Sequence, residues 1–248
     1  MNLARFVLAL AISFAACSTV TPEKMTSDKP LYEHASKLFA ERSYEESLKF
    51  FESLRNRFPQ SPYLIDTELK IAEARYRKDD FAEAEVEFQN FRTLHPTNPK
   101  IPYVTYMIGM SRFNRIPGGV DRDQTQTERA IDVFEELLQK YPAAPEATQA
   151  QTLLTKCQHD LAAREMYVAN FYLKRHDYSA ALLRLASVRT NPDFKDFAVE
   201  ASYKLGYARY KLNDVTGAKE VLTPLVSDPN AGEYGNKARN LLKRIASR

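Results

Sequence analysis

The residues able to do chemistry are scattered along the chain and form no recognisable catalytic group. The four histidines are His34, His95, His159 and His176. Cys157 and His159 are two residues apart, so on a helix their side chains face different directions and make a poor pair of metal ligands. Gly118-Gly119 lacks the strand and the lysine that a phosphate-binding loop needs. We therefore expect no metal site, no cofactor and no catalytic residues.

Charged residues also favour recognition over catalysis. Carboxylates alternate with other residues from Glu83 to Glu87 and at Glu135-Glu136, a pattern typical of a solvated helix face. The 35 Lys and Arg residues against 32 Asp and Glu residues give a net charge of +3, too close to neutral to indicate a nucleic-acid-binding protein. With 7 glycines in 248 residues, the chain has little material for tight hairpins, which disfavours an all-β fold.

The N-terminus has the pattern of a secretory signal. An apolar run from Phe6 to Ala16 is too short to span a membrane as a mature helix. It ends in Phe14-Ala15-Ala16-Cys17, which resembles a bacterial lipobox, where the cysteine is acylated and becomes the new N-terminus. We predict a signal peptide over residues 1–16, lipidation at Cys17 and a flexible tether over residues 17–30. The alternative is ordinary signal cleavage, with Cys17 as an incidental thiol.

A repeated pattern indicates the fold. A small residue is followed four residues later by a large apolar residue and eleven or twelve residues later by proline. The copies are Ser47-Phe51-Pro59, Ala84-Phe88-Pro96, Ala130-Phe134-Pro142, Ala181-Leu185-Pro192 and Ala218-Leu222-Pro229. The local period of 37 residues and the helix-turn-helix pattern match the tetratricopeptide repeat. We predict an all-α tetratricopeptide-repeat solenoid of five helix-turn-helix repeats plus a C-terminal capping helix from Tyr234 to Ala246.

Two spacings between repeats depart from 37 residues. The 9 extra residues before the third copy fall in Ile116–Gln126, which predicts a protruding loop. The 14 extra residues before the fourth copy fall in a stretch that has no Gly or Pro between Pro145 and Arg175, which predicts one long helix. The expected organisation is therefore repeats 1–3 over residues 31–144, a linking helix over 145–175, and repeats 4–5 with the capping helix over 176–248.

A solenoid of this kind offers an extended surface for a peptide. Arginine and tyrosine are suited to anchor a peptide that carries aromatic side chains and a terminal carboxylate. Arg57, Tyr63 and Tyr76 lie near the ends of helices in the first two repeats and are candidates for such contacts. The alternative for Tyr76 is packing between helices.

Several segments together resemble a known family. They are Leu94-His95-Pro96-Thr97-Asn98-Pro99, Tyr103-Val104-Thr105-Tyr106-Met107, Gly119-Val120-Asp121-Arg122-Asp123 and the stretch from Arg57 to Tyr63. The chain resembles the BamD family, lipoproteins of the outer-membrane β-barrel assembly machinery, from about Leu31 to Val226. The resemblance implies a lipid-anchored scaffold on the periplasmic face of the outer membrane. Its implied partners are the POTRA region of BamA, other Bam lipoproteins and the targeting segment of unfolded outer-membrane β-barrel proteins.

The resemblance also implies roles for individual residues. The N-terminal repeats are implicated in substrate recognition, which places Arg57, Tyr63 and Tyr76 at the substrate peptide. The C-terminal repeats contact BamA, and Arg184 matches a family arginine at that contact, although an arginine there can also be a solvated charge.

The inserted loop at Asp121 and Arg122 is a further candidate for the BamA contact. Other functions remain open at this point. They are a secretin pilotin, a Tol-associated coordinator or, from another class, a peptidoglycan-associated hydrolase or its activator.

Overall fold

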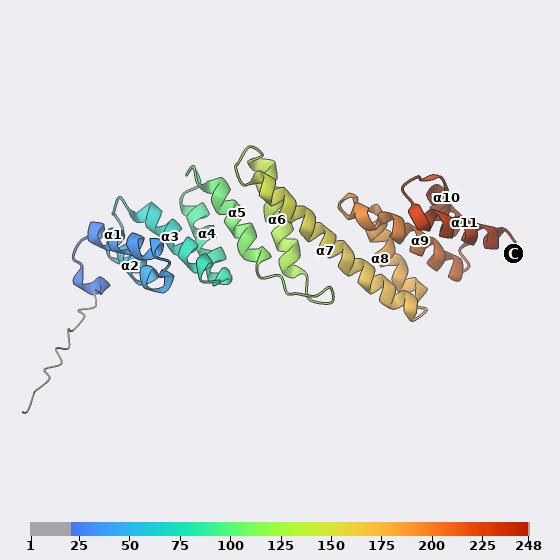
Figure 1. Ribbon diagram of the computed structural model, residues 1–248, viewed down its shortest axis with the longest axis horizontal. Coiled ribbons are helices and arrows are strands. Elements are labelled where there is room, and N and C mark those ends of the chain that lie inside the picture. The colour runs from blue at the N-terminus through green and yellow to red at the C-terminus, as the bar shows by residue number, and fades with distance from the viewer. Residues whose placement is uncertain (1–20, 248) are drawn as a thin grey trace, which may run out of the picture. The chain divides into compact units, whose positions relative to one another are not determined.

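The computed structural model describes residues 21–247, and all of their regular structure is helical. Cys17 and the signal peptide predicted over residues 1–16 lie outside the described residues. Figure 1 shows, in chain order, α1 (Asp28–Ala40), α2 (Tyr44–Arg57), α3 (Leu64–Arg77), α4 (Phe81–Leu94), α5 (Ile101–Phe113), α6 (Thr125–Lys140), α7 (Ala147–Lys174), α8 (Tyr178–Thr190), α9 (Lys195–Lys211), α10 (Val215–Ser227) and α11 (Gly232–Ala246), with short 3-10 helices η1 (Pro22–Lys24) and η2 (Pro192–Phe194). The predicted all-α fold of five helix pairs and a closing helix is confirmed.

The repeated residues occupy equivalent positions in the second helix of each pair. The small residues Ser47, Ala84, Ala130, Ala181 and Ala218 are all fully buried, and so are the large residues four positions later. Each second helix ends two residues before the proline of its copy, as α2 ends at Arg57 before Pro59. Proline lacks the N–H that would continue a helix, so the pattern fixes where these helices end.

The turns inside the pairs repeat in the backbone as well. Arg42, Asp79, His176 and Asn213 have φ values of 62°, 62°, 61° and 63°. These left-handed residues are 37 apart within each half of the chain and lie between the two helices of repeats 1, 2, 4 and 5. Repeat 3 instead connects its helices through the segment 114–124, which contains the predicted extra residues.

Gly109 allows the two helices of the third repeat to approach closely. A Cβ at this position of α5 would lie 2.5 Å from Cε1 of Phe134, whose ring on α6 is fully buried. Gly109→Ala is expected to destabilise the protein by about 2 kcal/mol, because overpacking of the core outweighs the gain of about 1 kcal/mol in helix propensity. Urea unfolding would measure the change. Gly118→Ala is the matched control, since its Cβ would meet nothing within 4 Å. A stabilised Gly109→Ala variant would contradict the steric argument.

The described chain forms two compact units, and their boundary lies between Ile71 and Ala72 within α3. The predicted grouping of the repeats on either side of the long helix stays a prediction. The long helix α7 packs against α6 as well as against α8 and α9. Cys157 is fully buried in this helix, and burial raises the pKa of its thiol to about 11.

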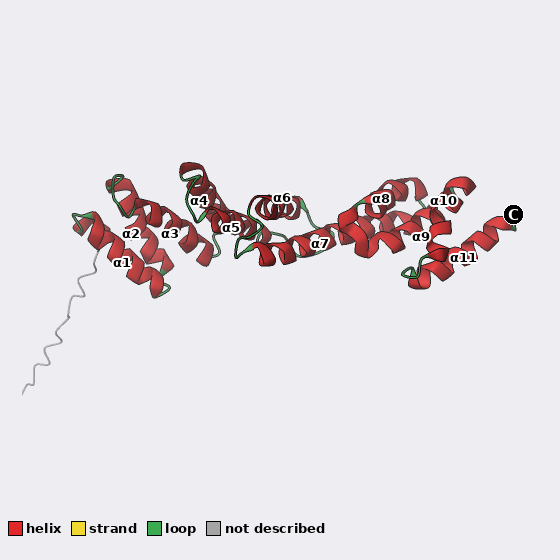
Figure 2. Ribbon diagram, turned by 90° about the horizontal axis from the view of Figure 1, so that it is seen from above, coloured by secondary structure: helices red, strands yellow, loops and turns green. Residues whose placement is uncertain are grey.

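Within the second unit, the C-terminal helices form two layers. Figure 2 shows α8 and α10 along one side and α7, α9 and α11 along the other. The helix α9 contacts both α7 and α11, and α8 packs between α7 and α9. Met166 of α7, Leu185 of α8 and Leu205 of α9 meet in one buried cluster. A second cluster, built around Leu222 and Leu241, holds α10 and α11.

Candidate binding surfaces

Arg57 holds the segment that precedes α1. Its Nη1 donates to the carbonyl oxygen of Pro22 at 2.9 Å, and its Nη2 donates to that of Met25 at 2.7 Å. Pro22 is buried, and α1 already begins at Asp28, whose carboxylate accepts a hydrogen bond of 2.7 Å from Ser61. Within the segment predicted as a flexible tether, residues 22–24 and 28–30 are thus helical. Sequence reasoning missed this contact because main-chain carbonyls as partners leave no residue pattern.

Tyr63 directly precedes α3 in the first unit and stacks on another tyrosine. Its ring centroid is 4.5 Å from that of Tyr32, with 15° between the ring planes. The Tyr32 hydroxyl donates to Asp66 at 2.6 Å, and burial, together with this carboxylate, raises the pKa of Tyr32 to about 12. The Tyr63 side chain is partly exposed, so one side of this stacked pair is accessible.

Tyr76 belongs to the second unit and has packing partners there. Its ring meets Phe81 edge to face at 5.3 Å, and its hydroxyl accepts a hydrogen bond of 2.8 Å from the Asn114 amide. Burial raises the pKa of Tyr76. These contacts are those expected if Tyr76 packs between helices. Its hydrogen bond with Asn114 also holds the start of the segment 114–124.

Asp121 and Arg122 are exposed near the tip of that segment. The backbone there turns at Gly119, whose φ of 105° favours glycine. The segment lies over α7, where Arg164 Nη1 contacts the Val120 carbonyl oxygen at 3.5 Å. Between them is a cavity of about 420 Å³, lined by apolar side chains that include Ile116 and by Lys156 and Asp160 of α7.

Arg184 lies on α8 and reaches back to α7. Its Nη1 is 3.0 Å from Glu165 Oε2, and the Arg184 side chain is 46% exposed while that of Glu165 is 17% exposed. Beside it, Leu183 is 75% exposed, and both line a groove of about 330 Å³ with Phe194. The loop and Arg184, the two candidate BamA contacts, thus interact with consecutive residues of α7. The loop contacts Arg164, and Arg184 pairs with Glu165.

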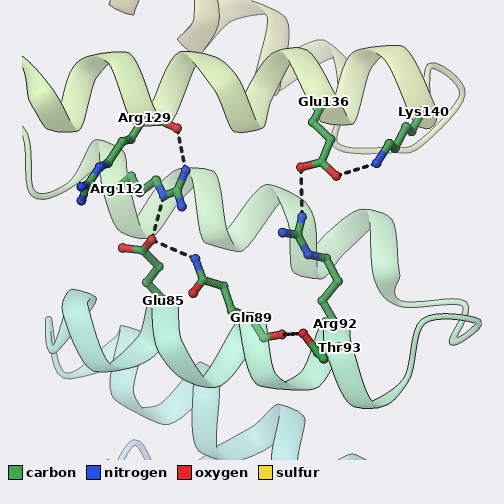
Figure 3. A network of polar contacts seen from close by, with 8 residues as sticks. All are labelled: Glu85, Gln89, Arg92, Thr93, Arg112, Arg129, Glu136 and Lys140. Carbon is green, nitrogen blue, oxygen red and sulfur yellow. Dashed lines mark hydrogen bonds and ion pairs between the residues drawn. The ribbon is translucent and has the colours of Figure 1, made fainter.

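Carboxylates that the sequence assigns to a solvated face form a network between helices instead (Figure 3). The Glu85 side chain on α4 is only 13% exposed and accepts hydrogen bonds from Arg112 Nε at 2.8 Å and Arg115 Nη1 at 2.7 Å. Arg112 also donates to the Arg129 carbonyl oxygen of α6 at 2.9 Å. The solvated-face interpretation is therefore wrong for Glu85.

A second set of contacts lies further along the same helices. Arg92 of α4 donates to Glu136 of α6 at 3.1 Å, and Lys140 donates to the same carboxylate at 2.9 Å. Burial alone would raise the pKa of Glu136, but Lys140 and Arg92 together hold it below its usual value. Both sets of contacts connect α4 to α6 and position the surface of the third repeat.

Among residues 21–247, no three His, Cys, Asp or Glu side chains are grouped so that they would hold a metal ion. Within the same range, no helix has the length and apolar character needed to cross a membrane.

Comparison with known proteins identifies the family. The family model YfiO, described as an outer membrane lipoprotein, matches residues 24–219. The chain belongs to this family. Curated relatives carry the name outer membrane protein assembly factor BamD, so the predicted BamD resemblance is confirmed.

The BamD relatives match over most of their length. The protein from Neisseria gonorrhoeae is 30% identical over 197 residues, covering 73% of this chain and 74% of the relative. The one from Vibrio cholerae is 28% identical over 226 residues, covering 86% and 92%, and the one from Caulobacter vibrioides is 26% identical over 219 residues, covering 86% and 72%. The YfiO match includes both unusual spacings between repeats and every candidate site residue except Cys17.

Proposed function

We propose that the protein is a lipid-anchored, non-catalytic outer-membrane protein assembly factor. The observation that carries this proposal is its membership of the YfiO family, whose match extends over residues 24–219. In this role it is attached to the periplasmic face of the outer membrane through Cys17. It binds the POTRA region of BamA, works beside other Bam lipoproteins, and receives the targeting segment of unfolded outer-membrane β-barrel proteins.

The substrate segment is assigned to the N-terminal repeats, with Arg57, Tyr63 and Tyr76 as candidate contacts. The contacts of Arg57 support this assignment, because its guanidinium already binds main-chain carbonyl oxygens, which any extended peptide offers. A substrate that used Arg57 would displace residues 22–25. Moderate affinity suits the task, since tight binding would slow release of the substrate to the barrel-forming subunit.

The BamA contact is assigned to the surface on either side of α7. The exposed Leu183 and Arg184 border one groove, and the loop with Asp121 and Arg122 borders a cavity on the other side. Arginine at an apolar rim is typical of protein interfaces. Because both features meet α7, one rigid helix would present them together to a folded partner domain.

A mild-detergent pull-down of tagged full-length protein from its own membranes, followed by mass spectrometry, tests this function. Stoichiometric recovery of a BamA-like barrel subunit is the expected result. Recovery of a secretin or of Tol components in its place would assign the protein to one of the alternative roles and contradict the proposal.

Arg184→Glu is expected to weaken binding to the POTRA region at least tenfold. The substitution reverses a charge at the proposed contact and sets a second carboxylate against Glu165. Calorimetry with the isolated POTRA region would measure the affinity. Arg189→Glu is the matched control, because Arg189 is also an exposed arginine on α8 and does not border the Arg184 groove. Equal affinities for the parent protein and Arg184→Glu would remove Arg184 from the interface.

A further inference from the structure

The N-terminal segment occupies both terminal nitrogens of Arg57. The carbonyl oxygens of Pro22 and Met25 accept from Nη1 and Nη2 at 2.9 and 2.7 Å. The Met25 N–H donates to the Pro22 carbonyl oxygen at 3.1 Å, so a single turn, η1, presents both carbonyl groups to the guanidinium. An incoming chain that used the same two donors would have to replace this turn, because each N–H points at one acceptor.

The sequence favours a turn at residues 22–25. Pro22 is the first residue of η1, where a fixed φ is favourable and a missing N–H costs nothing. Pro22 is buried, and η1 packs against α2. A second contact follows at the start of α1, where Ser61 Oγ donates to Asp28 at 2.7 Å and lowers the pKa of that carboxyl group. The segment is therefore held at both ends, by Arg57 and by Ser61.

We name residues 22–25 the N-terminal strap. The Tyr63 N–H donates to the same Ser61 Oγ at 3.2 Å. Both candidate substrate contacts of the first unit, Arg57 and Tyr63, are thus linked through hydrogen bonds to the strap or to the start of α1 directly after it.

Little apolar surface holds the strap in place. Among residues 21–27, only Pro22 is buried. Hydrogen bonds from a guanidinium are strong, but ordering a segment at the end of the chain costs conformational entropy. Since the strap contributes only main-chain acceptors to Arg57, the main chain of another peptide offers equivalent partners. We therefore expect the strap to open locally while the helices stay folded.

We propose that the N-terminal strap is an autoinhibitory segment, which competes with an incoming peptide for Arg57 and lengthens the lipid anchor when it is displaced. The inference rests on the proposed function, which assigns the substrate to Arg57 and lipidation to Cys17. With the strap bound, five residue steps, at most about 17 Å, separate Cys17 from Pro22. With the strap released, eleven steps reach the start of α1 at Asp28 and extend up to about 37 Å.

Competition of this kind has a definite sign. The peptide binds to molecules whose strap is open, so its apparent affinity falls with the fraction of open molecules. A variant that weakens the strap but keeps Arg57 should bind the peptide more tightly. Pro22→Gly is such a variant, because glycine lacks the fixed φ and the buried ring. If residues 22–25 were part of the peptide-binding surface, the same variant would bind more weakly.

Two measurements on the full-length protein in mild detergent test the competition. The probe is a fluorescent peptide with alternate Tyr and Phe residues, a free C-terminal carboxylate and no Lys or Arg. By anisotropy, Pro22→Gly is expected to bind it at least threefold more tightly than the parent protein. Pro96→Gly is the matched control, because Pro96 is exposed and lies outside the first unit. Saturating peptide should also speed tryptic cleavage of the parent at Lys24–Met25 at least fivefold, measured by mass spectrometry.

Energy transfer in lipid vesicles tests the longer anchor. A donor dye at Glu33→Cys labels an exposed position of α1, whereas Cys157 is fully buried. With acceptor dye in the lipid, unlabelled peptide should lower the transfer, because the released link lets the folded body move further from the membrane. Unchanged transfer at saturating peptide would overturn the lengthening of the anchor.

The outcomes separate failure of this inference from failure of the proposed function. If the parent binds the peptide, Arg57→Ala does not, and Pro22→Gly binds no more tightly than the parent, the strap does not compete. The inference is then overturned while the substrate assignment stands. If Arg57→Ala binds as the parent does, or if the parent binds no peptide, the substrate assignment fails and the inference fails with it. Equal tightening in Pro22→Gly and Pro96→Gly would also overturn the strap.

Discussion

Glu85→Ala is expected to destabilise the second unit by about 3 kcal/mol. The carboxylate of Glu85 is the shared acceptor of Arg112 and Arg115, at 2.8 and 2.7 Å, and its side chain is 13% exposed. Removing it leaves two guanidinium groups, 16% and 32% exposed, facing each other without a counter-charge. Arg112, in the last turn of α5, also donates a hydrogen bond to the Arg129 carbonyl oxygen of α6. Removing the Glu85 carboxylate therefore disturbs contacts among α4, α5 and α6.

Hydrogen exchange would locate this effect as well as measure it. In a repeat protein each repeat contacts mainly its neighbours, so opening should increase most in α4, α5 and α6. The urea midpoint should fall with it. Glu33→Ala is the matched control, because the pair of Glu33 with Lys29 spans 3.8 Å with both side chains more than 60% exposed. That variant should lose less than about 1 kcal/mol. Equal losses in the two variants would show that the buried network adds nothing beyond a surface pair.

The repeat architecture could be predicted from the sequence because it depends on local and periodic signals. A buried small residue such as Ala84, a large partner such as Phe88 and a terminating proline such as Pro96 recur at fixed spacing. The long helix was predictable for a related reason, since no Gly or Pro interrupts the segment that forms α7. These features need no knowledge of which helices touch.

The contacts of the candidate sites could not be predicted in the same way, because they join residues distant in the sequence. Glu85 has the same local pattern as its exposed neighbours, and only the approach of α5 buries it. Arg57 is bound to carbonyl oxygens about 32 to 35 residues away, and main-chain carbonyls are present at every residue. Exposure of Tyr167 and Phe171 likewise depends on how α8 and α9 pack against α7.

Cys17→Ala is expected to release the protein from the outer membrane completely. Each buried methylene of an acyl chain contributes about 0.8 kcal/mol to membrane binding, so stable anchoring requires more than one chain on the cysteine. The variant lacks the acceptor for these chains. Membranes washed with high salt and then with alkaline carbonate would show the result, because the washes remove protein held only by partner subunits. A variant that still pellets with washed membranes would contradict lipidation at Cys17.

The contact at Arg57 gives this anchor a short reach, which release by trypsin from lipid vesicles can test. A free tether from Cys17 to Leu31 would extend up to about 48 Å, whereas five residue steps from Cys17 to the docked Pro22 extend at most about 17 Å. The anchored protein should therefore lie close to the lipid, with the Lys24–Met25 bond protected by the two Arg57 hydrogen bonds. In lipid vesicles, Arg57→Ala should remain anchored while trypsin releases its folded body about tenfold faster than that of the parent protein. Arg55→Ala, which changes a neighbouring arginine of α2, is the control. Equal rates of release for Arg57→Ala and the parent would show that residues 22–25 do not shorten the anchor, whatever the outcome for Cys17→Ala.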